Sequence, residues 1–186
     1  MYFSTVLTSR MALLGGIFDI LGAFHHYAGK GGDPKKLNKK EVKELLAEQL
    51  GLAECECPSG QMDECLKSLD EDQDGEVDFC EFMPLLAGFT ILIETEKEAP
   101  STLLKGIQTI KKVFVDYASK EGDPSTLSKH EVKLLLQEQL YGEEKLDKAK
   151  ADEHFKELDL DGDAQVDIVE YFVFLATLCT CINDLL

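Results

Sequence analysis

Hydrophobic residues recur along most of the chain at spacings of three and four positions, which is the pattern of amphipathic α-helices. Strand-like segments are nearly absent. The exceptions are Val77 and Val166, which we expect to pair briefly with Leu37 and Leu127. The pattern therefore predicts an all-α protein. The expected helices cover residues 11–27, 38–50, 79–93, 103–117, 128–140 and 168–182, with further helices running through Leu66 and Leu69 and through Phe155 and Leu158.

The order of these helices occurs twice along the chain. Residues 24–50 match residues 114–140 without a gap, at an offset of 90 and with 17 of 27 positions identical. Residues 66–82 match residues 155–171 at an offset of 89, so the one-residue change falls in a segment between the matches, where loops tolerate it. Two homologous units are therefore expected, joined by a charged segment that ends in proline. The expected units are residues 1–94 and 101–186, and the expected linker is residues 95–100.

The segment DEDQDGEVDFCE, residues 70–81, has the spacing of a calcium-binding loop. Calcium takes about six to eight oxygen ligands, and a twelve-residue loop supplies them from alternate positions around a glycine turn at position six. Gly75 stands at that turn. An acidic surface loop without a ligand role would not need this coincidence. The predicted ligands are the side chains of Asp70, Asp72, Asp74, Asp78 and Glu81 and the backbone carbonyl of Glu76, with Asp78 acting directly or through water.

The second unit carries the same loop, DLDGDAQVDIVE at residues 159–170, with one departure. Ala164 stands at position six, where the turn favours glycine. A side chain there costs on the order of 1–2 kcal/mol, which corresponds to a roughly five- to thirtyfold loss of affinity. Because five carboxylates remain, we expect this loop to bind calcium, but more weakly than residues 70–81. The predicted ligands are Asp159, Asp161, Asp163, Asp167 and Glu170, with the carbonyl of Gln165.

The first loop of each unit is longer and poor in carboxylates. These loops are residues 28–41 and 118–131. Asn38 and Ser128 could cap the helices that come after them, with Glu41 and Glu131 completing capping boxes. The two glutamates could instead close a metal site, and the local sequence does not decide between these roles.

A fourteen-residue variant loop, a hinge and a twelve-residue acidic loop succeed one another in each unit. This arrangement resembles the S-100 family of small EF-hand proteins, here as a tandem member, over almost the whole chain. In that family the variant loop binds calcium mainly through backbone carbonyls and one bidentate glutamate, which implies weaker sites. By position, the implied ligands are the carbonyls of Ala28, Gly31, Asp33 and Lys36 with the side chain of Glu41, and those of Ala118, Glu121, Asp123 and Thr126 with Glu131.

The resemblance also implies an architecture. We expect two S-100-type units, each a pair of EF-hands with four helices, in which first and fourth helices build a helical bundle. The units could pair within one chain or between two chains, and the sequence leaves both open. Up to four calcium ions per chain are implied, two bound more strongly and two more weakly.

The composition of the chain limits the classes of partner that we expect it to bind. The 36 acidic and 19 basic residues give a formal net charge of −17, which disfavours nucleic acid and anionic lipid and favours basic partners. The longest apolar run, residues 82–93, is shorter than the roughly 18–20 residues of a membrane span, so no integral membrane segment is expected.

The six cysteines lack CxxC spacing and are expected to be free thiols of a cytoplasmic protein, although Cys55 and Cys57 keep oxidation or metal binding open. The family resemblance keeps secretion without a signal peptide open.

Histidines raise the question of zinc, because many members of the family bind it through an HxxxH pair in the last helix. No HxxxH occurs here: Glu94 and Glu98 stand at the matching places of the first unit, and Asn183 stands in the second. The histidines are therefore expected to be exposed or loosely packed. They are His25, His26, His130 and His154.

The sequence has no nucleophile elbow, phosphate-binding glycine loop or zinc-hydrolase motif, so we expect no enzyme. A calcium sensor would expose an apolar groove on binding the ion and dock an amphipathic, basic helix of a target protein. A calcium buffer would bind the ion without opening a groove. The family resemblance favours the sensor. The expected groove residues are the hinges, about 51–61 and 141–149, and parts of 82–93 and 171–182.

Overall fold

The computed structural model describes residues 12–51, 67–70, 72–90, 101–142, 144 and 146–183, and every structural statement below concerns these residues. The first unit contains α2 (Ala12–Ala28), β1 (Lys36–Asn38), α3 (Lys39–Leu50), β2 (Glu76–Asp78) and α5 (Phe79–Thr90). The second contains α6 (Thr102–Ala118), β3 (Leu127–Ser128), α7 (Lys129–Leu136), the π-helical segment η2 (Gln137–Tyr141), α8 (Lys148–Leu158), β4 (Gln165–Val166) and α9 (Ile168–Asn183). Residues 67–69 are also helical. The expected linker at 95–100, Leu66 and nearly all of the first hinge lie outside the described residues.

The predicted strand pairs are confirmed. β1 pairs antiparallel with β2 and places Leu37 opposite Val77, while β3 pairs with β4 and places Leu127 opposite Val166. All four of these side chains are buried. Each short ladder therefore ties the first loop of a unit to its second loop.

The helix expected over residues 128–140 is interrupted. α7 ends at Leu136, and η2 continues to Tyr141 with a different hydrogen-bond pattern. The side chain of Gln137 then organises the chain beyond η2, because its amide nitrogen donates to the carbonyls of Gly142 and Glu144, each at 2.7 Å. Its amide oxygen accepts from the backbone N–H of Leu146. One glutamine thus holds the described part of the second hinge.

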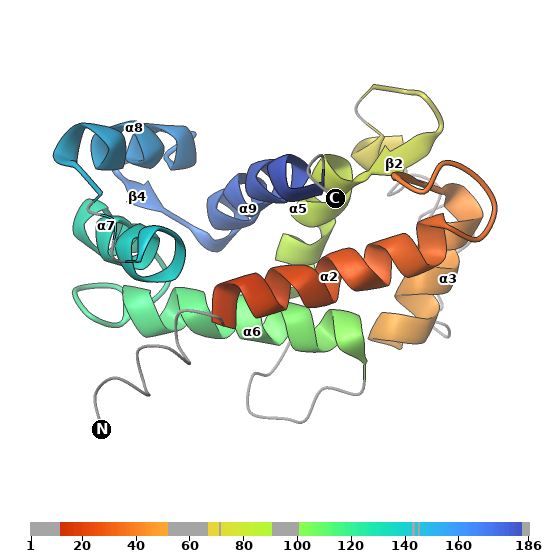
Figure 1. Cartoon of the computed structure of the whole chain (residues 1–186), viewed down its shortest axis with the longest axis horizontal. Coiled ribbons are helices and arrows are strands. Elements are labelled where there is room, and N and C mark those ends of the chain that lie inside the picture. Colours follow the sequence, from red (N-terminus) through yellow and green to blue (C-terminus); the bar gives the residue numbers. More distant parts are fainter. Residues whose placement is uncertain are drawn as a thin grey trace.

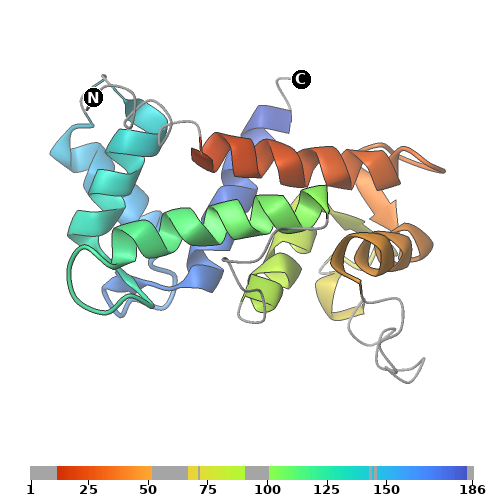
Figure 2. The same cartoon turned by 90° about the horizontal axis from the view of Figure 1, so that it is seen from below.

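The two units share one hydrophobic core within the chain. α2 lies antiparallel against α6, and α5 and α9 pack against each other on one side of that pair (Figure 1; Figure 2). The two strand pairs lie at opposite ends of this bundle (Figure 1). Gln49 at the end of α3 adds a polar link, because its carbonyl accepts from the Ser101 hydroxyl at the start of α6. In this structure the first and fourth helices of the two units therefore meet inside a single chain.

The described helices include none that is both long and apolar enough to cross a membrane.

α2 and α6 approach each other closely at two glycines. A Cβ atom on Gly106 would lie 2.8 Å from the carbonyl oxygen of Gly16 and 2.8 Å from a side-chain carbon of Ile20. A Cβ atom on Gly16 would lie 2.9 Å from a side-chain carbon of Ile110. Since backbone atoms cannot move aside as a flexible side chain can, the contact between α2 and α6 requires glycine at position 106. At Gly16 the nearest backbone atom, the carbonyl oxygen of Gly106, would lie 3.1 Å from an added Cβ atom, so the fit is tight there as well.

This contact predicts opposite effects for two glycine-to-alanine substitutions. Gly106→Ala should lower the free energy of unfolding by about 1–3 kcal/mol, because the added methyl group overpacks the crossing. Gly22→Ala, on the exposed face of α2 with nothing within 4 Å, should raise it by about 0.5–1 kcal/mol through helix propensity. Urea unfolding followed by circular dichroism measures both. Equal effects of the two substitutions would show that α2 and α6 do not meet at Gly106.

Candidate calcium sites

The loop at residues 70–81 is wrapped around its own carboxylates. One oxygen each of Asp70, Asp72 and Asp74 lie within 4.8 Å of one another. Backbone N–H groups hold them in place: Gly75 donates to Asp70 Oδ2 at 3.0 Å, and Glu76 donates to Asp74 Oδ1 at 2.8 Å. The other oxygen of Asp70, Oδ1, is buried and has no hydrogen-bond partner. A buried carboxylate oxygen without a donor fits a cation ligand, so these residues suit calcium.

The closing glutamate of this loop stands apart from the three aspartates. Glu81 Oε2 accepts from the backbone N–H of Asp78 at 2.9 Å, and Asp78 Oδ1 accepts in return from the N–H of Glu81 at 2.9 Å. Glu81 Oε1 faces the N–H of Asp72 at 3.5 Å. Neither Asp78 nor Glu81 joins the 4.8 Å group. The structure therefore brings together three of the predicted side-chain ligands, and it places Asp78 at the end of β2 and Glu81 in the first turn of α5.

The loop at residues 159–170 is built in the same way with a different grouping. Here Asp159, Asp161 and Glu170 lie within 4.8 Å. Glu170, which is buried, accepts through Oε1 from the N–H of Leu160 at 2.8 Å and through Oε2 from that of Asp167 at 2.9 Å. Asp163 and Asp167 lie outside the group and accept bonds from the N–H groups of later loop residues. The glutamate thus spans the loop from its first turn to its end.

Among its described residues, each acidic loop contains two in the left-handed backbone region. In the first loop they are Gln73 (φ 60°) and Gly75 (φ 86°), and in the second they are Gly162 (φ 78°) and Ala164 (φ 67°). The glycine and the non-glycine have exchanged positions, so each loop carries one strained side chain. That the second loop binds more weakly stays a prediction, but Gln73 removes the backbone difference on which it rested. A comparison of position four in the two loops, where Gln73 matches Gly162, would have shown from the sequence that the glycine and the non-glycine are exchanged.

In the first loops the capping role is confirmed, and the ligand role stays a prediction. Asn38 and Ser128 cap their helices, and Glu41 and Glu131 complete the capping boxes. Both glutamates are buried, and Glu131 Oε1 also accepts from the N–H of Glu121 across the loop at 2.8 Å. Because Glu81 and Glu170 make the same bond to the residue three positions earlier, capping and loop closure are one geometry. The capping boxes therefore leave the ligand role of Glu41 and Glu131 standing.

The candidate carbonyl ligands of these loops are partly engaged. The carbonyl of Asp33 accepts from the N–H of Lys36 at 3.0 Å, and the carbonyl of Asp123 accepts from that of Thr126 at 3.3 Å. A carbonyl oxygen has two lone pairs, so each keeps one for a cation. The Ser125 hydroxyl, which donates to the Asp123 carboxylate, and the Ser125 backbone N–H lower the pKa of that carboxyl. Asp123 is therefore ionised at neutral pH.

The histidines are not brought together. The metal-ligating groups found in the described part of the chain contain only carboxylates. His154 lies between the second hinge and α9, with Nε2 2.7 Å from the Tyr141 hydroxyl and its ring against Phe174. His26 and His130 are exposed, as expected. Glu94 and Glu98 lie outside the described residues, as do Cys55 and Cys57, whereas Cys80 and Cys179 are free thiols.

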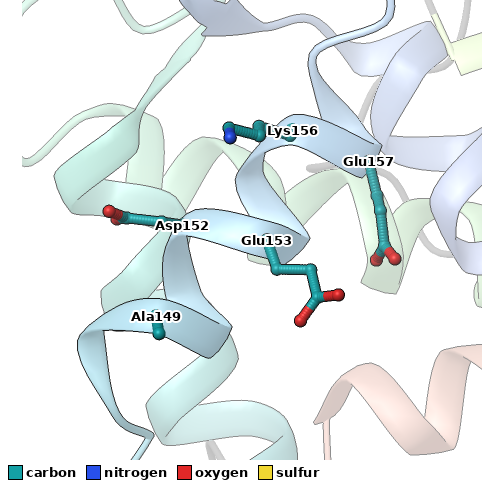
Figure 3. Close-up of a pocket in the computed structure, with 5 residues that line it drawn as sticks. All are labelled: Ala149, Asp152, Glu153, Lys156 and Glu157. Atoms are coloured by element: carbon teal, nitrogen blue, oxygen red, sulfur yellow. The ribbon is translucent and has the colours of Figure 1, made fainter.

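The outer face of α8 is polar. Figure 3 shows an open depression along it, lined by Ala149, Asp152, Glu153, Lys156 and Glu157. The apolar side chains of the same helix, Ala151, Phe155 and Leu158, are buried. Of the residues expected to line the groove of the second unit, Leu146, Phe174 and Leu175 are buried as well.

Comparison with known proteins gives one consistent result. The profile of the S-100/ICaBP type calcium binding domain matches residues 13–51 and 103–142. Protein S100-A5 of Rattus norvegicus is 39% identical over 82 residues, which cover 44% of this chain and 88% of the relative. Protein S100-G of Equus caballus is 45% identical over 71 residues, which cover 38% of this chain and 89% of the relative. Ictacalcin of Ictalurus punctatus is 40% identical over 78 residues, which cover 41% of this chain and 85% of the relative. Each relative thus corresponds to about one unit.

The exchanged glycines predict symmetrical effects on calcium affinity. Gln73→Gly should strengthen binding at residues 70–81, and Ala164→Gly should strengthen binding at residues 159–170, each by about five- to thirtyfold, because each removes one strained side chain. Gly162→Ala is the matched control, and it should weaken calcium binding at residues 159–170. Calcium titrations followed through the backbone amide signals of each loop measure these changes. A response to Ala164→Gly alone would show that position four carries no strain.

Proposed function

Because this chain belongs to the S-100 family of calcium-binding proteins, we propose that it is a calcium sensor, which exposes an apolar groove on binding the ion and docks target proteins there. The observation that supports this most directly is the bond from Leu160 to Glu170. Asp159 stands at the end of α8, and Glu170 stands in the first turn of α9. A calcium ion that takes both carboxylate oxygens of Glu170 replaces its bonds to the loop backbone and releases the end of α8.

Movement of α8 would uncover apolar surface. Phe155 and Leu158 are buried, and the ring of His154 lies against Phe174 of α9. α9 packs against α5 of the other unit, whereas the main contacts of α8 are with α7 and α9 of its own unit, so α8 is the element that we expect to turn. The uncovered groove would lie beside Glu153 and Glu157, which project from α8 (Figure 3). An acidic edge around an apolar groove suits an amphipathic helix with basic residues.

We propose one calcium ion per loop, four in all, with the two acidic loops filled first. At the predicted side-chain ligand positions, the acidic loops offer five carboxylates each, whereas the first loops offer one glutamate each and otherwise backbone carbonyls, and affinity rises with ligand charge. The free thiols Cys80 and Cys179 suit a reducing compartment, so the cytoplasm is the proposed location.

The sensor predicts that apolar surface appears with calcium. A dye that fluoresces on apolar surface should brighten as calcium is added and should reach a plateau. Glu170→Gln should remove the part of the response that comes from the second unit, and Glu81→Gln the part from the first, because each loses the bidentate ligand while an amide oxygen can still cap the helix. Calcium bound without any dye response would leave a calcium buffer as the function.

The proposed stoichiometry predicts four calcium adducts by native mass spectrometry of the wild-type chain. Glu41→Gln combined with Glu131→Gln should remove the two ions that bind last, since each loop loses its only ligand carboxylate. The helical content, measured by circular dichroism, should change little because glutamine keeps the cap. Loss of the first two ions instead would contradict the proposed order of affinity.

A further inference from the structure

The side chain of Lys36 crosses from the first loop of its unit to the second. Its backbone lies in β1, opposite Asp78 in β2. Its ammonium group bonds to Asp74 Oδ2 and lies 4.0 Å from Asp72 Oδ2. Two of the three aspartates gathered at the first acidic site therefore face a positive charge that belongs to the protein.

The second unit has no such charge among its described residues. Thr126 stands at the position that matches Lys36, and its hydroxyl donates to Gln165 Oε1 at 2.5 Å. Gln165 in turn matches Glu76 of the first unit. Asp161 and Asp163, which match Asp72 and Asp74, form no ion pair with a described lysine. The two units thus differ at the same place in an otherwise repeated loop.

We propose that the Lys36 ammonium is a built-in competitor of calcium at residues 70–81 and lowers the affinity of that site. An ion that takes ligands from Asp72 and Asp74 has to displace the ammonium, because two cations at the same carboxylates repel each other. The side chains of Lys36 and Asp74 are each about one-third exposed, at 31% and 32%, so the pair is partly shielded from solvent. The inference rests on the proposed role of residues 70–81 as a calcium site.

Lys36 also connects the two loops of the first unit. Its backbone carbonyl is an implied ligand of the first loop, while its ammonium occupies ligands of the second. Calcium in the second loop frees the side chain of a residue that belongs to the first. The second unit, with threonine at this position, has no charged group among its described residues that would pass between its loops in this way.

The test uses two mirrored substitutions and a charge control in the full chain. Lys36→Thr should lower the calcium concentration at the midpoint of the Gly75 signal change by about two- to fivefold, which is the effect expected from the loss of one partly exposed ion pair. The midpoint at Gly162 should not change. Thr126→Lys should move the midpoint at Gly162 upward. Lys40→Thr removes the same charge from a residue that pairs with Glu44, and it should shift neither midpoint. The amide signals of Gly75 and Gly162 report each loop separately.

Three results would overturn the inference. An unchanged or weaker midpoint at Gly75 in Lys36→Thr would mean that the ammonium does not compete and instead helps to shape the loop. An equal shift from Lys40→Thr would show that the effect comes from the change in net charge alone. If Gly75 of the wild-type protein did not respond to calcium at all while Gly162 did, the assignment of residues 70–81 as a calcium site would fail, and the role of Lys36 with it.

Discussion

The structure depends on one carboxylate per loop that accepts backbone N–H bonds at the start of the next helix. In each loop, the last glutamate accepts the N–H of the residue three positions earlier: Asn38, Asp78, Ser128 and Asp167 donate to Glu41, Glu81, Glu131 and Glu170. This bond starts the helix and also holds the carboxylate against the loop. Since the other oxygen faces the beginning of the loop, a cation there would take over bonds that the backbone now makes. The group that caps each helix is thus also the predicted calcium ligand that closes the loop.

In the proposed sensor, the shared core would limit which helix can move. α5 and α9 begin at the closing glutamates of the acidic loops and pack against each other, while α2 and α6 cross at Gly16 and Gly106. Lys111 of α6 adds a bond to the carbonyl of Thr90 at the end of α5. These contacts hold the first and fourth helices of both units in one body. In the proposed sensor, a change at Asp159 on binding calcium would therefore move α8 rather than α9, because α9 packs against α5 of the other unit.

Much of this arrangement could be predicted from the sequence. Spacing located the helices and the strand pairs Leu37–Val77 and Leu127–Val166, and the repeat located the two units. Capping by Glu41 and Glu131 was predicted and is confirmed, whereas their role as calcium ligands stays a prediction. The pairing of the units inside one chain could not be predicted, since Gly16 and Gly106 have meaning only once α2 and α6 lie together. The π-helical segment depends on Gln137, whose partners lie in a hinge without periodicity.

The two units are similar in fold but differ at the points where a response would begin. The first acidic loop meets the ammonium of Lys36 and carries its strained side chain at Gln73, whereas the second meets the uncharged Thr126 and carries its strain at Ala164. Gln137 organises the second hinge, and Ala47, at the matching position of the first unit, has no amide with which to do the same. Because these differences lie in the loops and the hinge, they leave the shared core unchanged. A tandem chain can therefore give its two halves different calcium responses without giving up the packing that joins them.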